Sequence, residues 1–250
     1  MERWDDTMKI IFLGTNGWFT TKLGYTACVF AETPEEYIFL DAGTGFFRAP
    51  LYTEEDKPVR IFLSHFHLDH IIGFFWLAAA LPNKEIEVYG QPGTEKVLTT
   101  LIDKPFFPVP LKRQQLKLSF HELKPGHHMI HDLDVTCDLL AHSDPVYGYR
   151  INNLSYCTDT KPCPNSVKLS RDAELLIHEC SFKEGRAGGS HSRPSEAAKI
   201  ASDAHVKRLI LFHFDASVYR TKRDKAQAAR IAGKTFANTA VAEDSMEVMI

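Results

Sequence analysis

Short apolar runs alternate with polar turns along the first half of the chain. Four of these runs have the length and the β-branched or aromatic content of buried strands, and they cover residues 9–13, 25–31, 37–40 and 59–63. A continuous apolar run over residues 71–81 ends at Pro82, which predicts a buried helix. A short strand over residues 86–89 and an amphipathic helix over residues 93–102 are expected to follow.

The second half of the chain shows the same alternation of apolar runs and polar turns. Strands are expected over residues 116–123, 134–141, 154–157, 173–177, 208–212 and 246–250. Helices are expected over residues 194–205, with Ser192 as the candidate N-cap, and over residues 223–234. The segment Pro105–Pro110 is expected to be a loop, because its prolines cannot donate backbone hydrogen bonds.

This order of elements predicts an α/β fold of two mixed β-sheets flanked by helices, in a single domain over residues 1–250. Residues 1–7 precede the first apolar run and are expected to form a loose extension. The sequence shows no signal peptide and no membrane-spanning run, so a cytoplasmic protein is expected.

Composition narrows the range of partners. The chain has 250 residues and a formal net charge of −3, with 44% hydrophobic and 24% charged residues. A mildly acidic chain argues against a broad basic face for long nucleic acid, but it is compatible with a small anionic substrate at a metal centre. The five cysteines are scattered and form no C-x-x-C pair, which favours reduced thiols over a disulfide framework.

Residues 65–70, with the sequence HFHLDH, combine four metal-type ligands directly after a strand-like run. In extended backbone His65 and His67 point to the same side, and Asp69 continues that register. His70 is offset and faces elsewhere unless the chain turns. Imidazole and carboxylate ligands suit zinc, manganese or iron, and this loop could supply one ion or two.

Three further candidates each follow an apolar strand, as His65 does. They are His142, Asp159 and His213, and the carboxylate of Asp159 could bridge two ions. Taken singly, each has a simpler interpretation, as a polar strand terminus or a turn residue. A rival cluster at residues 127–131 is expected to be an exposed hairpin, and His121 and His178 are expected to be satisfied core residues.

His191 lies in a glycine-rich loop that opens a predicted helix, and Glu179 ends the preceding strand. A histidine that a glutamate holds in such a loop can act as a general acid. The alternative from the residues alone is an ordinary surface histidine.

Taken together, these residues resemble the metallo-β-lactamase-fold hydrolases, and within them the ribonuclease Z-like phosphodiesterase branch. The resemblance covers roughly residues 9–215 and is carried by the motifs LDAG at residues 40–43, HFHLDH at 65–70, HSDPVYGYRI at 142–151, CTDTKP at 157–162, HECSF at 178–182 and SHS at 190–192. It implies an αββα sandwich with a dinuclear metal site.

The resemblance also implies a role for each candidate residue. His65, His67 and His142 would hold the first ion, Asp69, His70 and His213 the second, and Asp159 would bridge them. Asp69 would also belong to the catalytic set, Asp41 would orient a ligand histidine, and His191 with Glu179 would form the general acid pair. Members of the branch are often dimers, and Phe106–Phe107 is the candidate contact for a homodimer.

The chain departs from the tRNA-processing members of the branch. Those proteins carry a long arm between the Gly-Tyr-Arg-Ile motif and the strand that leads to the bridging aspartate. Here Ile151 is followed only by Asn152-Asn153 before the next strand begins at Leu154. A closer analogy is a cyclic phosphodiesterase of the same branch, although its cysteine-rich zinc site has no counterpart here.

The leading hypothesis is therefore a dinuclear phosphodiesterase that hydrolyses a small cyclic or nucleotide-type diester with a metal-bridging hydroxide. Three alternatives remain open. The same fold could hydrolyse a lactone, thioester or β-lactam, could process tRNA 3′ ends without the arm, or could serve as a non-enzymatic sensor or scaffold.

Overall fold

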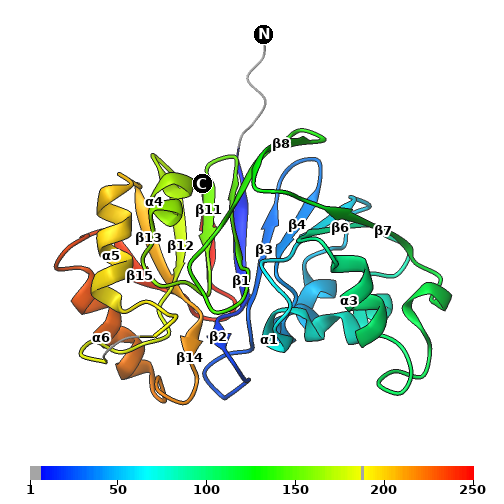
Figure 1. Ribbon diagram of the computed structural model, residues 1–250, viewed down its shortest axis with the longest axis horizontal. Helices are drawn as coiled ribbons and strands as arrows, with labels where there is room; N and C mark the ends of the chain where they lie inside the picture. The colour runs from blue at the N-terminus through cyan, green and yellow to red at the C-terminus, as the bar shows by residue number, and fades with distance from the viewer. Residues whose placement is uncertain (1–6, 187–188) are drawn as a thin grey trace, which may run out of the picture. The chain divides into compact units, whose positions relative to one another are not determined.

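The computed structural model describes residues 7–186 and 189–250 (Figure 1). The chain divides into two compact units. Unit 1 comprises Met1–Gly14, Tyr25–Leu123 and Asp244–Ile250, and unit 2 comprises Thr15–Gly24 and Lys124–Glu243. The expected extension over residues 1–7 lies, apart from Thr7, outside the described residues, and the expected single domain stays a prediction.

The described part of unit 1 contains a seven-stranded mixed sheet. In spatial order its strands are β16 (Glu247–Met249), β1 (Lys9–Gly14), β3 (Cys28–Glu32), β4 (Tyr37–Leu40), β5 (Val59–Phe62), β6 (Glu85–Gly90) and β7 (Lys117–Glu122). The pairs from β16 to β4 are antiparallel and those from β4 to β7 are parallel. Strands β4 and β5 are buried along their whole length, which explains their unbroken apolar character.

The prediction of one continuous helix over residues 71–81 is wrong. The segment folds as α1 (Leu68–Ile71), the 3-10 helix η2 (Ile72–Trp76) and α2 (Leu77–Ala80). The backbone N–H of Gly73 donates to the carbonyl of Ala42 at 2.7 Å, outside the helix, and an α-helical ladder cannot continue through that residue. The other helices of unit 1 are η1 (Thr44–Leu51), α3 (Thr94–Leu101) and η3 (Leu111–Arg113).

The described part of unit 2 contains a second seven-stranded mixed sheet. Its spatial order is β15 (Thr239–Val241), β13 (Arg208–Phe212), β12 (Leu175–Glu179), β11 (Leu154–Cys157), β10 (Tyr147–Ile151), β9 (Leu133–Leu139) and β8 (Gly126–Ile130). The pairs from β15 to β11 are parallel and the others are antiparallel. A small ladder joins β2 (Asn16–Gly17) to β14 (Phe214–Asp215).

Three helices lie along one side of the unit 2 sheet (Figure 1): α4 (Pro164–Ser170), α5 (Pro194–Asp203) and α6 (Lys222–Ala232). The predicted cap of α5 is wrong, because the N-cap residue is Arg193 and its side chain pairs with Glu196. The hydroxyl of Ser192 instead donates to the carbonyl of Thr160 at 2.6 Å. The two mixed sheets with their helices confirm the predicted α/β class.

Polar residues gather where parallel strands end, which is where ligands bind in sheets of this kind. In unit 1 β4 leads to Asp41, and in unit 2 β11 leads to Asp159 and β13 to His213. All three adopt the left-handed backbone region, with φ of +59°, +44° and +52°. Strained backbone of this kind costs on the order of 1–3 kcal/mol per residue and is concentrated at functional sites.

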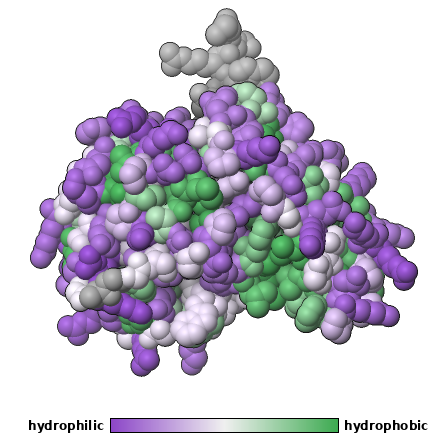
Figure 2. Space-filling model, viewed as in Figure 1, coloured by the Kyte–Doolittle hydropathy of each residue, from purple (hydrophilic) through white to green (hydrophobic). Residues whose placement is uncertain are grey.

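The surface is mostly hydrophilic with scattered hydrophobic patches on the face that Figure 2 shows. Among the described residues, no helix is long and apolar enough to cross a membrane. All five cysteines are free, as expected, and four of them are buried. Burial raises the pKa of the Cys157 thiol to about 12, so that it stays protonated and unreactive.

Replacing Gly43 with alanine tests how tightly the segment after β4 packs on α1. An added Cβ would lie 2.1 Å from the carbonyl oxygen of Asp69 and 2.8 Å from that of Ala27, although the φ of −72° suits any residue. Overpacking of this kind costs about 1–3 kcal/mol, which for a chain of this size lowers the midpoint of thermal unfolding by roughly 2–12 °C.

Gly233→Ala is the matched control, because Gly233 has a helical φ of −60° and its nearest neighbour would be 3.1 Å away. We expect the control to unfold within about 2 °C of the wild type. Equal melting of the two variants would contradict the close packing of Gly43.

Candidate functional site

A buried aspartate organises the histidine loop of unit 1. Asp41 accepts hydrogen bonds from the Ser64 backbone N–H at 2.7 Å, from the Ser64 hydroxyl at 2.8 Å and from His70 Nδ1 at 2.7 Å. Both Asp41 and His70 are 0% exposed. One carboxylate thus joins the end of β4 to both ends of the ligand loop.

The loop brings its three imidazoles together. The ring centroids of His65 and His67 are 4.4 Å apart, and those of His65 and His70 are 4.3 Å apart. The chain turns into α1 after His67, which removes the offset that extended backbone would give His70. Asp69 lies in the same turn, with its Oδ2 3.6 Å from His70 Nε2.

Hydrogen bonds fix which nitrogen of each buried ring carries a proton. The single hydroxyl proton of Ser64 goes to Asp41, so the hydroxyl oxygen must accept from His65 Nδ1, which lies 3.0 Å away. His70 Nδ1 likewise donates to the carboxylate of Asp41. A neutral imidazole that donates through Nδ1 keeps its lone pair on Nε2, so Nε2 is the nitrogen through which each of these rings can bind a metal.

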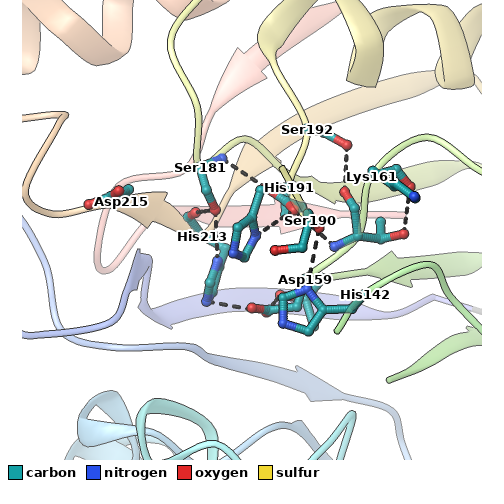
Figure 3. A network of polar contacts seen from close by, with 12 residues as sticks. His142, Asp159, Lys161, Ser181, Ser190, His191, Ser192, His213 and Asp215 are labelled. Atoms are coloured by element: carbon teal, nitrogen blue, oxygen red, sulfur yellow. Dashed lines mark hydrogen bonds and ion pairs between the residues drawn. The ribbon is translucent and has the colours of Figure 1, made fainter. Parts of the chain in front are cut away.

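Unit 2 carries a second group of ligand-type residues at its strand ends (Figure 3). Asp159 follows β11, and its Oδ2 lies 3.3 Å from Nε2 of His213, which follows β13. Both residues are 3% exposed. Nδ1 of His142 donates to the carbonyl of Ser190 at 3.3 Å, which turns this ring toward the same group.

Ser181 holds His213 as Ser64 holds His65. The Ser181 hydroxyl donates to the backbone carbonyl of His213 at 2.8 Å. Its oxygen must then accept from His213 Nδ1 at 3.1 Å, which again leaves the lone pair on Nε2. Gly17 leaves room for this ring, because a Cβ there would lie 2.4 Å from His213 Cε1.

Glu179 anchors the loop histidine of unit 2. Its fully buried carboxylate accepts from the backbone N–H groups of Thr160 and Ser181 at 2.9 and 2.8 Å and from His191 Nδ1 at 2.9 Å. Burial by itself would lower the pKa of His191. The hydrogen bond and the negative charge of Glu179 outweigh burial and raise that pKa above the ordinary histidine value.

His191 is close enough to the ligand residues of unit 2 for two different roles. Its ring centroid lies 5.0 Å from that of His142 and 6.2 Å from that of His213. His142, Asp159 and His191 offer ligand atoms within 4.8 Å of one another, as do Glu179, His191 and His213. The geometry suits either a proton donor beside the ligands or a further ligand.

The donor set fits divalent metal ions. Four imidazoles, those of His65, His70, His142 and His213, are held through Nδ1 and present Nε2. Such anchoring by carboxylates, hydroxyls and carbonyls is typical of metal-binding histidines. Asp69 in unit 1 and Asp159 in unit 2 add carboxylate oxygens, so the donors of each unit are of the N/O type that suits zinc, manganese or iron.

The structure also bears on the other histidines. His178 is buried, as expected, and burial lowers its pKa. His121 is not a core residue, because it lies exposed on β7 and stacks on Tyr89 with ring centroids 4.8 Å apart. His127 lies in the β8–β9 hairpin, and its Nε2 pairs with Oδ1 of Asp134 at 3.0 Å.

Sequence reasoning missed the two serines that set the ring protons. Ser64 directly precedes His65, and Ser181 lies two residues after Glu179. Their side chains look like ordinary loop residues in the sequence. Only the position of Ser64 between a buried strand and a ligand run offered a signal.

Comparison with known proteins gives sequence relatives named ribonuclease Z. The protein of that name from Crocosphaera subtropica is 28% identical over 96% of this chain and 97% of its own length. YhfI from Bacillus subtilis, a metallo-β-lactamase fold protein, superposes with a TM-score of 0.82 at 20% identity, covering 98% of this chain and all of the other. A diphosphatase from the PhnP family gives a TM-score of 0.75 at 16% identity, covering 98% and 97% of the two chains.

At these identities the solved structures show the shared fold alone. A family model described as "Beta-lactamase superfamily domain" matches residues 36–214, which is well over half of the chain. The matched range includes Asp41, the ligand loop of unit 1 and the strand-end residues of unit 2 up to His213. The chain therefore belongs to the β-lactamase superfamily, and it is a metal-dependent hydrolase with the metallo-β-lactamase fold.

Proposed function

We propose that this hydrolase cleaves small phosphodiesters whose leaving group is an alkoxide, which is a poor leaving group unless it is protonated. The observation that carries the proposal is His191, which the buried carboxylate of Glu179 holds beside His142, Asp159 and His213. An alkoxide needs a proton to leave, and a histidine next to the metal ligands is placed to supply it.

The ligands of the two ions in this proposal are those that the family resemblance implies, namely His65, His67, Asp69, His70, His142, Asp159 and His213. The anchored rings and carboxylates within each unit support it. Divalent ions bound there, zinc or manganese in our proposal, would supply Lewis-acid catalysis that activates water near neutral pH and balances the charge of the phosphate.

Residues of this chain perform the remaining steps. Asp41, Ser64 and Ser181 keep the ligand rings oriented, so little reorganisation is needed during the reaction. Nε2 of the protonated His191 ring donates to the leaving oxygen, while Nδ1 stays bonded to Glu179. The negative charge of Glu179 favours the protonated ring before the transfer.

The tight connection after β10 supports a small substrate. Strands β10 and β11 pair directly, with Ile151 opposite Leu154, and only Asn152 and Asn153 join them. The Ile151–Leu154 pair closes this hairpin, and the turn is further tied to β9, because the N–H of Asn152, with a φ of +49°, donates to the carbonyl of Asp134. A substrate-gripping arm has no place between these two strands.

Ribonuclease activity is the second candidate. Relatives named ribonuclease Z align with 96–97% of this chain, so an RNA 3′ end as substrate has support from sequence. We propose the small diester ahead of it because of the closed hairpin and the net charge of −3. The free cysteines fit a reducing compartment such as the cytoplasm, and a homodimer stays a prediction.

Replacing His191 with alanine should separate a proton donor from a metal ligand. We expect kcat for a diester with an alkyl leaving group to fall by about 10²–10⁴, because the leaving alkoxide is no longer protonated. A p-nitrophenyl ester, whose leaving group needs no proton, should lose far less, and the metal content should not change.

His127→Ala is the control for that variant, because it removes a histidine of a surface His–Asp pair with the similar separation of 3.0 Å. It should leave both rates and the metal content at wild-type values. Loss of metal from His191→Ala would make His191 a ligand and refute its role as the acid.

Replacing Asp159 with alanine tests the proposed bridge between the ions. A bridging carboxylate serves two ions, so we expect the variant purified without added metal to lose most of its bound metal in elemental analysis. Asp203→Ala, in an exposed pair with Lys199 on α5, should retain the wild-type metal content. An unchanged content in Asp159→Ala would rule out the bridge.

Parallel assays of one metal-loaded preparation should rank the substrate classes. We expect measurable turnover of bis(p-nitrophenyl) phosphate and little turnover of a simple lactone. We also expect kcat/KM to be lower for a tRNA precursor with a 3′ trailer than for the best of the small diesters assayed. A precursor tRNA with the highest kcat/KM would establish the ribonuclease instead.

A further inference from the structure

A pocket of about 270 Å³ opens beside His191 and His213 in unit 2, and neither the metal ligands nor the acid pair accounts for its other walls. Those walls come from Trp18 after β2, from Phe182 and Arg186 between β12 and α5, and from Asp215 in β14. Ligand clefts usually measure roughly 300–1,000 Å³, so this pocket lies near the lower end of that range and suits a single nucleoside-sized group.

Flat surfaces dominate the pocket. The guanidinium carbon of Arg186 lies 3.9 Å from the ring centroid of Phe182, and the Phe182 ring meets the His191 ring edge-on at 5.3 Å. The indole of Trp18 is 69% exposed. Aromatic rings and guanidinium planes are the surfaces on which proteins stack nucleic-acid bases.

The backbone holds Trp18 at the pocket at an energetic cost. Trp18 has a φ of +70°, which is rare for a bulky residue, and it follows Gly17, whose missing Cβ makes room for the His213 ring. The exposed indole thus lies next to a proposed metal ligand. A strained and exposed tryptophan at such a place indicates a binding role.

The charges of the pocket favour a neutral group over a second phosphate. Oδ1 of Asp215 accepts from the backbone N–H and the hydroxyl of Ser217 at 2.8 and 2.6 Å, and its Oδ2 lies 3.7 Å from Arg186. The carboxylate offsets the guanidinium charge. It also offers an acceptor for a sugar hydroxyl or a base amino group.

We infer that this pocket binds the nucleoside whose hydroxyl is the leaving group of the diester, an inference that rests on the proposed function. His191 both lines the pocket and donates the proton, so the group seated there is the one attached to the protonated oxygen. Water forms the new P–O bond, and the P–O bond to the nucleoside breaks. The nucleoside oxygen takes its proton from His191, which regains one from the attacking water.

The orientation can be read from the products. The methyl phosphodiesters of 2′-deoxyadenosine, esterified at the 3′ or at the 5′ hydroxyl, have two alkoxides of similar leaving ability. The metal-loaded wild type should convert the ester it accepts into deoxyadenosine and methyl phosphate. Formation of deoxyadenosine monophosphate and methanol would overturn the assignment.

The stacking role of Trp18 can be measured with a matched ester that lacks the base. The wild type should prefer the adenine ester in kcat/KM, and Trp18→Ala should lose about 5- to 150-fold of that preference, chiefly through KM. Trp18→Phe should retain part of it, and Arg186→Gln should also weaken it. Phe106→Ala removes a ring of similar exposure in unit 1 (63%, against 69% for Trp18) and should leave the preference unchanged.

Calorimetric titration of the same proteins with deoxyadenosine gives a readout that needs no turnover. Binding by the wild type that Trp18→Ala weakens supports the pocket assignment. The enzyme could instead turn over bis(p-nitrophenyl) phosphate but show no preference for the adenine ester and no binding of deoxyadenosine. That result would overturn the inference and leave the proposed function standing. Absence of any diester turnover would overturn both.

Discussion

The position of one proton on each anchored histidine is the constraint on which the site depends. An imidazole can bind a metal only through a nitrogen that carries a lone pair, and in these rings that nitrogen must be Nε2. Ser64 and Ser181 ensure this. Each hydroxyl donates its only proton elsewhere, to Asp41 or to the backbone carbonyl of His213, so its oxygen must accept from Nδ1 of the histidine. Asp41 gives the same result with a carboxylate for His70. Glu179 also holds His191 through Nδ1, but its charge favours the ring that is protonated on both nitrogens, which suits a proton donor and not a ligand.

Both units apply this device at the same structural position. The anchors Asp41, Ser64, Glu179 and Ser181 lie at or just after the ends of parallel strands, so the sheet fixes their backbones. Asp41, Asp159 and His213 also adopt the left-handed backbone region there. The same arrangement explains the glycines nearby. Gly17 and Gly43 allow backbone or rings to approach more closely than any Cβ would permit.

Much of this could be predicted from the sequence, because it depends on local pattern. Buried parallel strands read as apolar runs, and a His-rich run after one of them indicates metal chemistry in any fold. The elements that the sequence did not predict are short or contain glycine or polar residues, such as the five-residue β10 with Gly148 at its second position and the seven-residue α4. The broken helix after His70 depends on the bond from Gly73 to Ala42, a tertiary contact that periodicity cannot show.

The pocket walls were beyond sequence reasoning for a similar reason. Trp18 and Arg186 lie 168 positions apart in the numbering, and neither stands in a recognisable motif. Their shared chemistry appears only when β2 pairs with β14 and the guanidinium of Arg186 stacks on the Phe182 ring.

Anomalous diffraction at the metal absorption edge, from crystals of protein purified without added metal, tests the central claim most directly. The account predicts two peaks roughly 3.5–4 Å apart, bound through Nε2 of the ligand histidines, with every Nδ1 bond intact and His191 outside the coordination sphere. A single peak, coordination through Nδ1, or a bond from His191 to the metal would contradict it.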